Sequence, residues 1–174
     1  MDTKQRLSAL EVALNNEMRE REFYLKHAKR TTNPVGKGMF QQIGDEELEH
    51  YERLSQLHQK WEKQEKWPDT IPLMVKGTIV KDVLAGLVKK VDEIPEGEAD
   101  DLDAIRTAIN FEAAGVKYYA KLRDMVSDPK EKQFFGLLVQ IENEHYLSLK
   151  DTEEYLTDPT SWHQKVEHHS LDGG

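Results

Sequence analysis

The sequence contains the pattern Glu-x-x-His twice, at Glu47–His50 and at Glu142–His145. A three-residue spacing places both side chains of each pair on one face of a helix. The neighbouring positions on that face are apolar, as Ile43 and Leu54 show for the first pair. An unpaired charge in such a position costs several kcal/mol, roughly, after relaxation. A bound metal cation is the simplest compensation.

Each pair follows a further glutamate at the same distance. Glu17 precedes Glu47 by 30 residues, and Glu112 precedes Glu142 by 30 residues. The two halves are therefore copies of one plan, 95 residues apart. An aromatic pair begins six residues after the first glutamate of each half and ends in Tyr24 or Tyr119.

The apolar residues recur with helical periodicity and predict four long helices. Each of the four glutamates lies on the apolar face of its own helix. We expect these helices at about 3–29, 34–66, 101–126 and 129–156. Asn33-Pro34 and Asp128-Pro129 are typical of helix starts, because the first residue caps the helix and proline fits its first turn. A crossover at 67–100, with a short helix within 81–91, connects the two hairpins.

An all-α fold follows, a four-helix bundle with a long crossover between its second and third helices. We expect the bundle to occupy residues 1–157 and a short C-terminal tail to occupy 158–174. Antiparallel packing brings the polar residues of all four helices to one level. Two divalent cations would balance four carboxylates there. The predicted metal ligands are Glu17, Glu47, His50, Glu112, Glu142 and His145.

In this interpretation Glu47 and Glu142 bridge the two metals, and Glu17 and Glu112 are terminal ligands. His50 and His145 each bind one metal. Oxygen and nitrogen ligands without sulfur suit iron or manganese, while affinity order alone also admits zinc. Two iron ions per chain are the predicted cofactor.

These motifs resemble those of the rubrerythrins, in the ferritin-like superfamily. The resemblance covers about residues 7–156 and includes both Glu-x-x-His pairs, with Phe23-Tyr24 and Tyr118-Tyr119 in order. It implies a di-iron enzyme that reduces hydrogen peroxide to water while the diferrous centre is oxidised, in defence against oxidative stress. It also implies a homodimer, in some family members with helices exchanged between subunits.

The sequence departs from the family pattern in two ways. Rubrerythrins commonly carry a rubredoxin domain with four cysteines, and this sequence has no cysteine. An external electron donor, such as a rubredoxin, is then expected. Rubrerythrins also have an additional glutamate near the third-helix ligand. In this sequence the neighbours of Glu112 on the same face are Ala108, Gly115 and Val116, so the additional glutamate is missing. The remaining six ligands form a symmetric set, closer to the ferroxidase centres of bacterioferritins.

Two interpretations are open for Tyr24 and Tyr119. They are either core aromatic residues with satisfied hydroxyls or catalytic side chains that hydrogen-bond a ligand or bound peroxide, or supply one electron. Gly115 either opens space for a small oxidant or permits close helix contact. Five glutamates lie off the apolar faces and are expected on the solvated surface, namely Glu20, Glu22, Glu46, Glu49 and Glu144.

The net charge of −9 over 174 residues argues against a nucleic-acid partner and suits a protein that attracts cations. The absence of cysteine excludes disulfides, thiolate zinc sites and iron–sulfur clusters from this sequence. No stretch of about 18 apolar residues occurs, so no membrane association is expected. We expect a cytoplasmic protein.

The sequence thus favours a di-iron oxidoreductase that acts as a peroxidase on hydrogen peroxide, or on dioxygen. Two alternatives remain open. A ferroxidase would oxidise and store or deliver iron, and would need a cage-like assembly or a capsid partner. A non-redox helical protein would hold a structural metal pair, such as zinc, and would not respond to peroxide.

Overall fold

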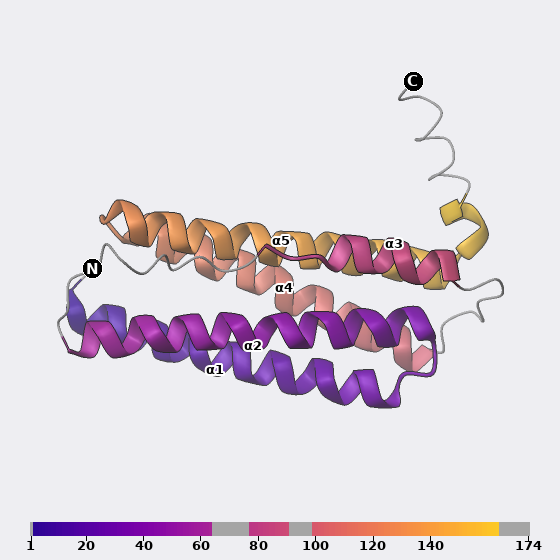
Figure 1. The fold of residues 1–174 in the computed structure, drawn as a ribbon, viewed down its shortest axis with the longest axis horizontal. Helices are drawn as coiled ribbons and strands as arrows, with labels where there is room; N and C mark the ends of the chain where they lie inside the picture. Colours follow the sequence, from indigo (N-terminus) through magenta and orange to yellow (C-terminus); the bar gives the residue numbers. More distant parts are fainter. Residues whose placement is uncertain (1, 64–76, 91–98, 164–174) are drawn as a thin grey trace, which may run out of the picture.

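Two long antiparallel helical hairpins pack side by side in the computed structural model (Figure 1). The structure describes residues 2–63, 77–90 and 99–163. The first hairpin consists of α1 (Thr3–Arg30) and α2 (Pro34–Glu62), and the second of α4 (Ala99–Met125) and α5 (Pro129–Thr157). The shorter α3 (Val80–Lys90) contacts α2 and α5. The predicted all-α bundle fold is confirmed.

Side-chain caps define the starts of three long helices. Asp2 and Gln5 form a capping box at α1, with the Asp2 side chain accepting from the Gln5 backbone nitrogen. Asn33 caps α2 and Asp128 caps α5, each accepting from two backbone N–H groups and each followed by proline. Both of these starts are as the sequence predicted.

The predicted end of the second helix is four residues too late, because α2 ends at Glu62 rather than near Lys66. Trp61 is the last buried residue of α2. Glu62 and Lys63, which follow it, are polar and exposed, so the buried face of α2 ends at Trp61. Residues 64–76 and 91–98 of the predicted crossover lie outside the described residues, and α3 matches the predicted short helix. In the tail, residues 159–163 are helical, and the rest of the tail lies outside the described residues.

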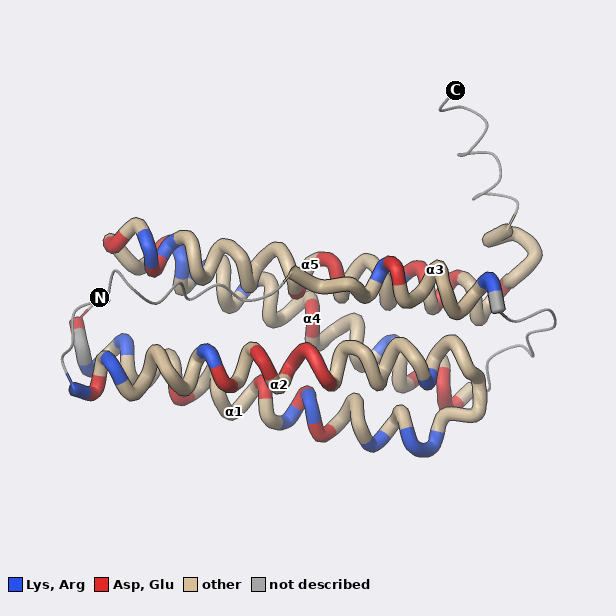
Figure 2. Tube along the Cα trace, in the orientation of Figure 1, with Lys and Arg blue, Asp and Glu red and all other residues tan. Residues whose placement is uncertain are grey.

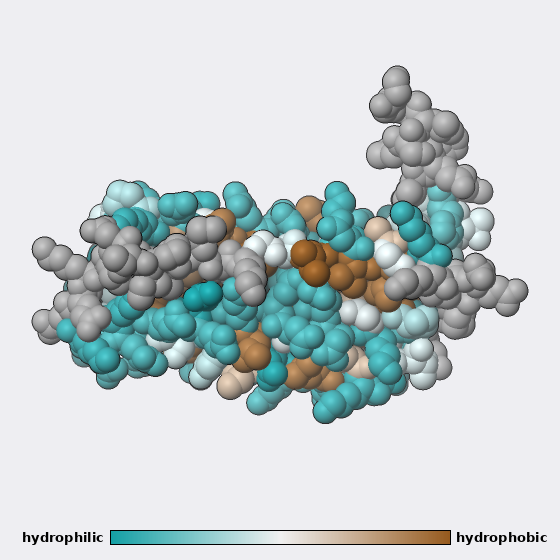
Figure 3. Space-filling model, viewed as in Figure 1, coloured by the Kyte–Doolittle hydropathy of each residue, from teal (hydrophilic) through white to brown (hydrophobic). Residues whose placement is uncertain are grey.

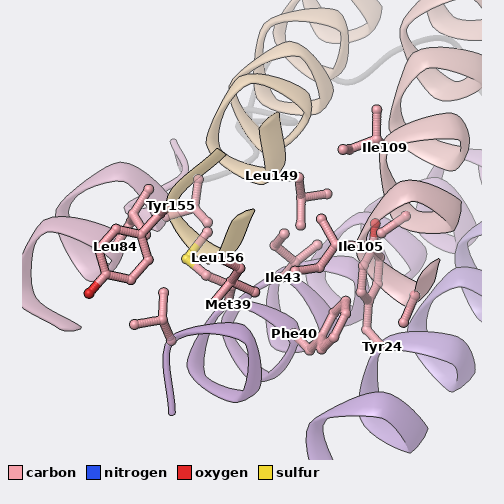
Figure 4. Packing of buried hydrophobic residues seen from close by; sticks show 14 of the residues in the cluster. Tyr24, Met39, Phe40, Ile43, Leu84, Ile105, Ile109, Leu149, Tyr155 and Leu156 are labelled. Carbon is pink, nitrogen blue, oxygen red and sulfur yellow. The ribbon is translucent and has the colours of Figure 1, made fainter. Parts of the chain in front are cut away.

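The buried apolar residues form two clusters, one toward each end of the bundle. One cluster includes Tyr24, Phe40 and Ile105 (Figure 4), and the other includes Leu54, Phe134 and Leu138. Along every long helix the predicted metal-ligand positions fall between residues of one cluster and residues of the other. The bundle therefore has an apolar–polar–apolar order along its axis, and the polar layer is shielded on both sides.

The short helix α3 lies on the outside of the bundle, where Val80, Leu84 and Val88 join the first apolar cluster. In the view of Figure 3, apolar side chains gather over α3. Ile79, just before this helix, is 54% exposed. No helix in the described part of the chain is long and apolar enough to cross a membrane.

Candidate metal centre

All four long helices contribute to the polar layer near their midpoints. Figure 2 shows acidic segments in the middle of α2, α4 and α5. The six side chains are each at most 2% exposed. They are Glu17 from α1, Glu47 and His50 from α2, Glu112 from α4, and Glu142 and His145 from α5. The structure therefore brings together all six side chains that the sequence predicts as ligands.

The six side chains divide into two sets of four that share Glu47 and Glu142. The His50 set consists of Glu17, Glu47, His50 and Glu142, and the His145 set of Glu47, Glu112, Glu142 and His145. Each set offers four ligand atoms that all lie within 4.8 Å of one another. Two cations placed in these sets would share Glu47 and Glu142 as bridging carboxylates.

The two imidazoles face the carboxylates through corresponding atoms. His50 Nδ1 lies 3.3 Å from Glu17 Oε2, 3.2 Å from Glu47 Oε2 and 3.3 Å from Glu142 Oε1. His145 Nδ1 lies 3.5 Å from Glu47 Oε1 and 3.5 Å from Glu112 Oε2. The two rings are nearly parallel, with centroids 5.9 Å apart. Each imidazole thus directs one nitrogen into a group of oxygens, as a metal ligand does.

Tyr24 and Tyr119 cross the bundle to bind the terminal carboxylates. The Tyr24 hydroxyl donates to Glu112 Oε1, and the Tyr119 hydroxyl donates to Glu17 Oε1. Both tyrosines are almost fully buried. Each hydrogen bond occupies one carboxylate oxygen and leaves Oε2, the oxygen that faces an imidazole. The hydroxyls are satisfied, and they also orient the carboxylates.

Several buried atoms that face the centre of this layer have no hydrogen bond of good geometry among the described residues. They are Glu17 Oε2, Glu47 Oε1, Glu112 Oε2, both carboxylate oxygens of Glu142, and His145 Nδ1. Buried polar atoms in proteins are nearly always paired, so a group of unpaired ones at one point needs an explanation. A pair of divalent cations coordinated by oxygen and nitrogen would satisfy all of these atoms together. The donor set therefore fits a dinuclear metal site.

Burial and mutual repulsion shift the pKa values of these groups in the direction that reduces the negative charge of the layer. Burial and the nearby charge of Glu47 raise the pKa of Glu17 to about 8. Burial and the charges of Glu47 and Glu112 raise the pKa of Glu142 well above its usual range. Burial alone would lower the pKa of His50, but the surrounding carboxylates outweigh it and raise that pKa well above its usual range. Without a cation, the layer therefore binds extra protons.

Two glutamates predicted on the solvated surface lie instead beside the site. Glu20 is half-buried, and burial together with Glu47, Glu112 and Glu17 raises its pKa to about 10. Glu46 is 16% exposed, and its Oε2 lies 2.6 Å from His145 Nε2. That prediction is therefore wrong for both residues. Glu20 follows Glu17 by three residues and Glu46 precedes Glu47 by one, so each lies at the border of its buried face.

The profile of the rubrerythrin family matches residues 8–153. The chain belongs to the rubrerythrin family. This match covers both helical hairpins and every side chain of the two metal-ligand sets. No curated protein and no solved structure matches the chain. Family membership and the buried carboxylate–histidine cluster together indicate a metal site of the rubrerythrin kind.

Gly115, one of the neighbours of Glu112 on the same helix face, lies at a close contact between α4 and α5. A Cβ atom added at Gly115 would lie 2.7 Å from Glu142 Oε2 and 3.3 Å from its Cδ. Any side chain at residue 115 must therefore displace the shared carboxylate. Of the two interpretations of Gly115, this contact favours close helix packing.

Gly115→Ala is therefore expected to weaken metal binding by about 10-fold or more while the bundle stays folded, because Glu142 belongs to both sets. Isothermal titration with Mn²⁺ measures the affinity. The matched control is Gly136→Ala, where the added Cβ would meet only Arg123 Cδ at 3.8 Å. Equal metal affinity in the two variants would contradict the role given to this contact.

Metal binding should release protons and should strengthen as the pH rises. Burial and the neighbouring carboxylates raise the pKa of Glu17 to about 8 and that of Glu142 well above its usual range in the metal-free chain, and cations bind the deprotonated forms. The apparent affinity is expected to increase between about pH 6 and pH 8. Calorimetry in buffers of different ionisation enthalpy counts the released protons. Heats of binding that are independent of the buffer would contradict this picture.

Proposed function

We propose that this chain is a di-iron oxidoreductase that reduces hydrogen peroxide, with dioxygen as the other candidate oxidant, in defence against oxidative stress. The observation that carries the proposal is the pair of ligand sets sharing Glu47 and Glu142, found in a chain of the rubrerythrin family. Iron is the metal we assign, because the ligands are carboxylates and imidazoles without sulfur.

Reduction of one hydrogen peroxide molecule to two water molecules consumes two electrons and two protons. Two ferrous ions, one in each ligand set, supply the two electrons when bound. The proposal keeps the expectations of a cytoplasmic homodimer and of an external electron donor, such as a rubredoxin, that restores the ferrous state.

The protein residues hold the reacting region in a defined geometry. Tyr24 and Tyr119 fix the terminal carboxylates so that Oε2 of Glu112 and of Glu17 faces inward. Burial and the adjacent carboxylates raise the pKa of both tyrosines well above the usual range. Both hydroxyls therefore stay protonated and remain hydrogen-bond donors at neutral pH.

The apolar clusters on both sides of the layer exclude bulk water from the site. Exclusion of water strengthens the electrostatic interactions between the cations and the four carboxylates. The same exclusion of water raises the pKa of the buried Glu17 and Glu142 carboxyl groups in the metal-free chain. The site is therefore built for a small oxidant and for charge transfer rather than for a large substrate.

Stopped-flow absorbance distinguishes this activity from the alternatives. The chain is loaded anaerobically with Fe²⁺ at two ions per chain, one for each ligand set, and mixed with hydrogen peroxide or with oxygenated buffer. We expect iron oxidation to be faster with peroxide than with oxygen at equal concentration. The control Glu47→Gln with Glu142→Gln removes both shared ligands and should show no rapid phase.

Two outcomes would contradict the proposal. Faster reaction with oxygen, with uptake continuing beyond two irons per chain, would identify a ferroxidase instead. A bound metal that responds to neither oxidant would leave a structural site. The symmetric six-ligand set keeps the ferroxidase as the second candidate, because Gly115 supplies no additional carboxylate.

A further inference from the structure

The two halves of the internal repeat differ at the residue before the shared glutamate. Glu46 precedes Glu47 in α2, and Ile141 precedes Glu142 in α5, so the two residues occupy corresponding positions 95 residues apart. Ile141 is buried in the second apolar cluster. Only one half of the repeat therefore has a carboxylate at this position, and the two ligand sets cannot be equivalent.

The Glu46 carboxylate contacts the outer nitrogen of a predicted ligand. Glu46 Oε2 lies 2.6 Å from His145 Nε2, while His145 Nδ1 faces Glu47 Oε1 and Glu112 Oε2 at 3.5 Å each. An ionised carboxylate only accepts hydrogen bonds, so the imidazole nitrogen in this contact carries the proton. In the neutral imidazole, Nδ1 then carries the lone pair, and Nδ1 faces the Glu47 and Glu112 oxygens of the ligand set. Glu46 fixes the tautomer that can bind a metal there.

Glu46 is itself held in place by groups outside the metal centre. Its Oε1 accepts from Gln42 Nε2 at 2.6 Å and from the Ile79 backbone nitrogen at 3.3 Å. Ile79 directly precedes α3, so the same carboxylate joins the start of this helix to α5. Both oxygens are anchored, and the orientation of Glu46 does not depend on His145 alone.

We propose that Glu46 is a positioning residue that orients His145 and makes the His145 set the tighter of the two metal positions. The inference rests on the metal site of the proposed function. A ligand imidazole whose second nitrogen donates to a carboxylate is more basic and has a fixed ring orientation, and loss of such a partner costs about 10–100-fold in metal affinity. Ile141 cannot accept a hydrogen bond, so the His50 set has no matching carboxylate from that position.

Two single-site backgrounds of the full chain test this selectivity, with Co²⁺ as the spectroscopic probe. His50→Ala leaves the His145 set with its histidine, and His145→Ala leaves the His50 set with its own. Glu46→Ala is added to each background, and Co²⁺ affinity is measured by titration. We expect a loss of about 10–100-fold in the first background. In the second background the change should stay within about 2-fold, because His145, the partner of Glu46, is already removed.

Two further variants separate positioning from charge. Asp45→Ala removes the same charge from the neighbouring, exposed position, where Asp45 contacts Gln41, and should change neither affinity. Glu46→Gln keeps an oxygen that accepts the Nε2 proton, and should recover part of the affinity that Glu46→Ala loses. Circular dichroism establishes that each variant keeps its helices.

The inference is overturned if Glu46→Ala weakens Co²⁺ binding equally in both backgrounds, or in neither, while the unmodified chain binds two Co²⁺ ions, one per set. In that case the dinuclear site and the proposed function still stand. If the unmodified chain binds no Co²⁺, the inference and the proposed function fail together. A loss confined to the His145 set, with partial recovery by Glu46→Gln, supports the inference.

Discussion

Repulsion among four buried glutamates is the constraint on which the rest of this structure depends. Glu17, Glu47, Glu112 and Glu142 meet between two apolar clusters, where water cannot screen their charges. The metal-free chain relieves this repulsion by binding protons, as the raised pKa values of Glu17 and Glu142 show. Two divalent cations would relieve it without protons, and they would also pair the unsatisfied carboxylate and imidazole atoms.

The near-symmetry of the site follows from the repeat in the sequence, and the departures from symmetry give its two positions different surroundings. Tyr24 and Tyr119 make equivalent contacts across the bundle, each to the terminal glutamate of the other hairpin. Glu46 has no acidic counterpart, because the corresponding residue is Ile141. Glu20 likewise corresponds to Gly115, whose missing side chain leaves room for the Glu142 carboxylate. Glu46 adds a carboxylate beside the His145 set, whereas burial and the neighbouring carboxylates raise the pKa of Glu20 to about 10, so Glu20 adds no negative charge at neutral pH in the metal-free chain.

Sequence periodicity predicted the bundle and the convergence of the six ligand candidates, because each residue lies on the apolar face of its own helix. Position relative to the apolar face of the helix wrongly predicted that Glu46 and Glu20 lie on the solvated surface. Their contacts depend on which helices pack beside α2 and α1, and a single helix cannot reveal its neighbours. Glu46 faces His145 of α5 and the start of α3, which are distant in sequence. The helical pattern was extended too far at the end of α2, where Trp61 is the last buried residue.

Anomalous diffraction at the iron edge, from crystals of the anaerobically loaded chain, tests the central claim most directly. The account predicts two iron peaks per chain, one beside His50 Nδ1 and one beside His145 Nδ1, with Glu47 and Glu142 contacting both. Iron outside this layer, or an empty layer in crystals that hold iron elsewhere, would contradict it.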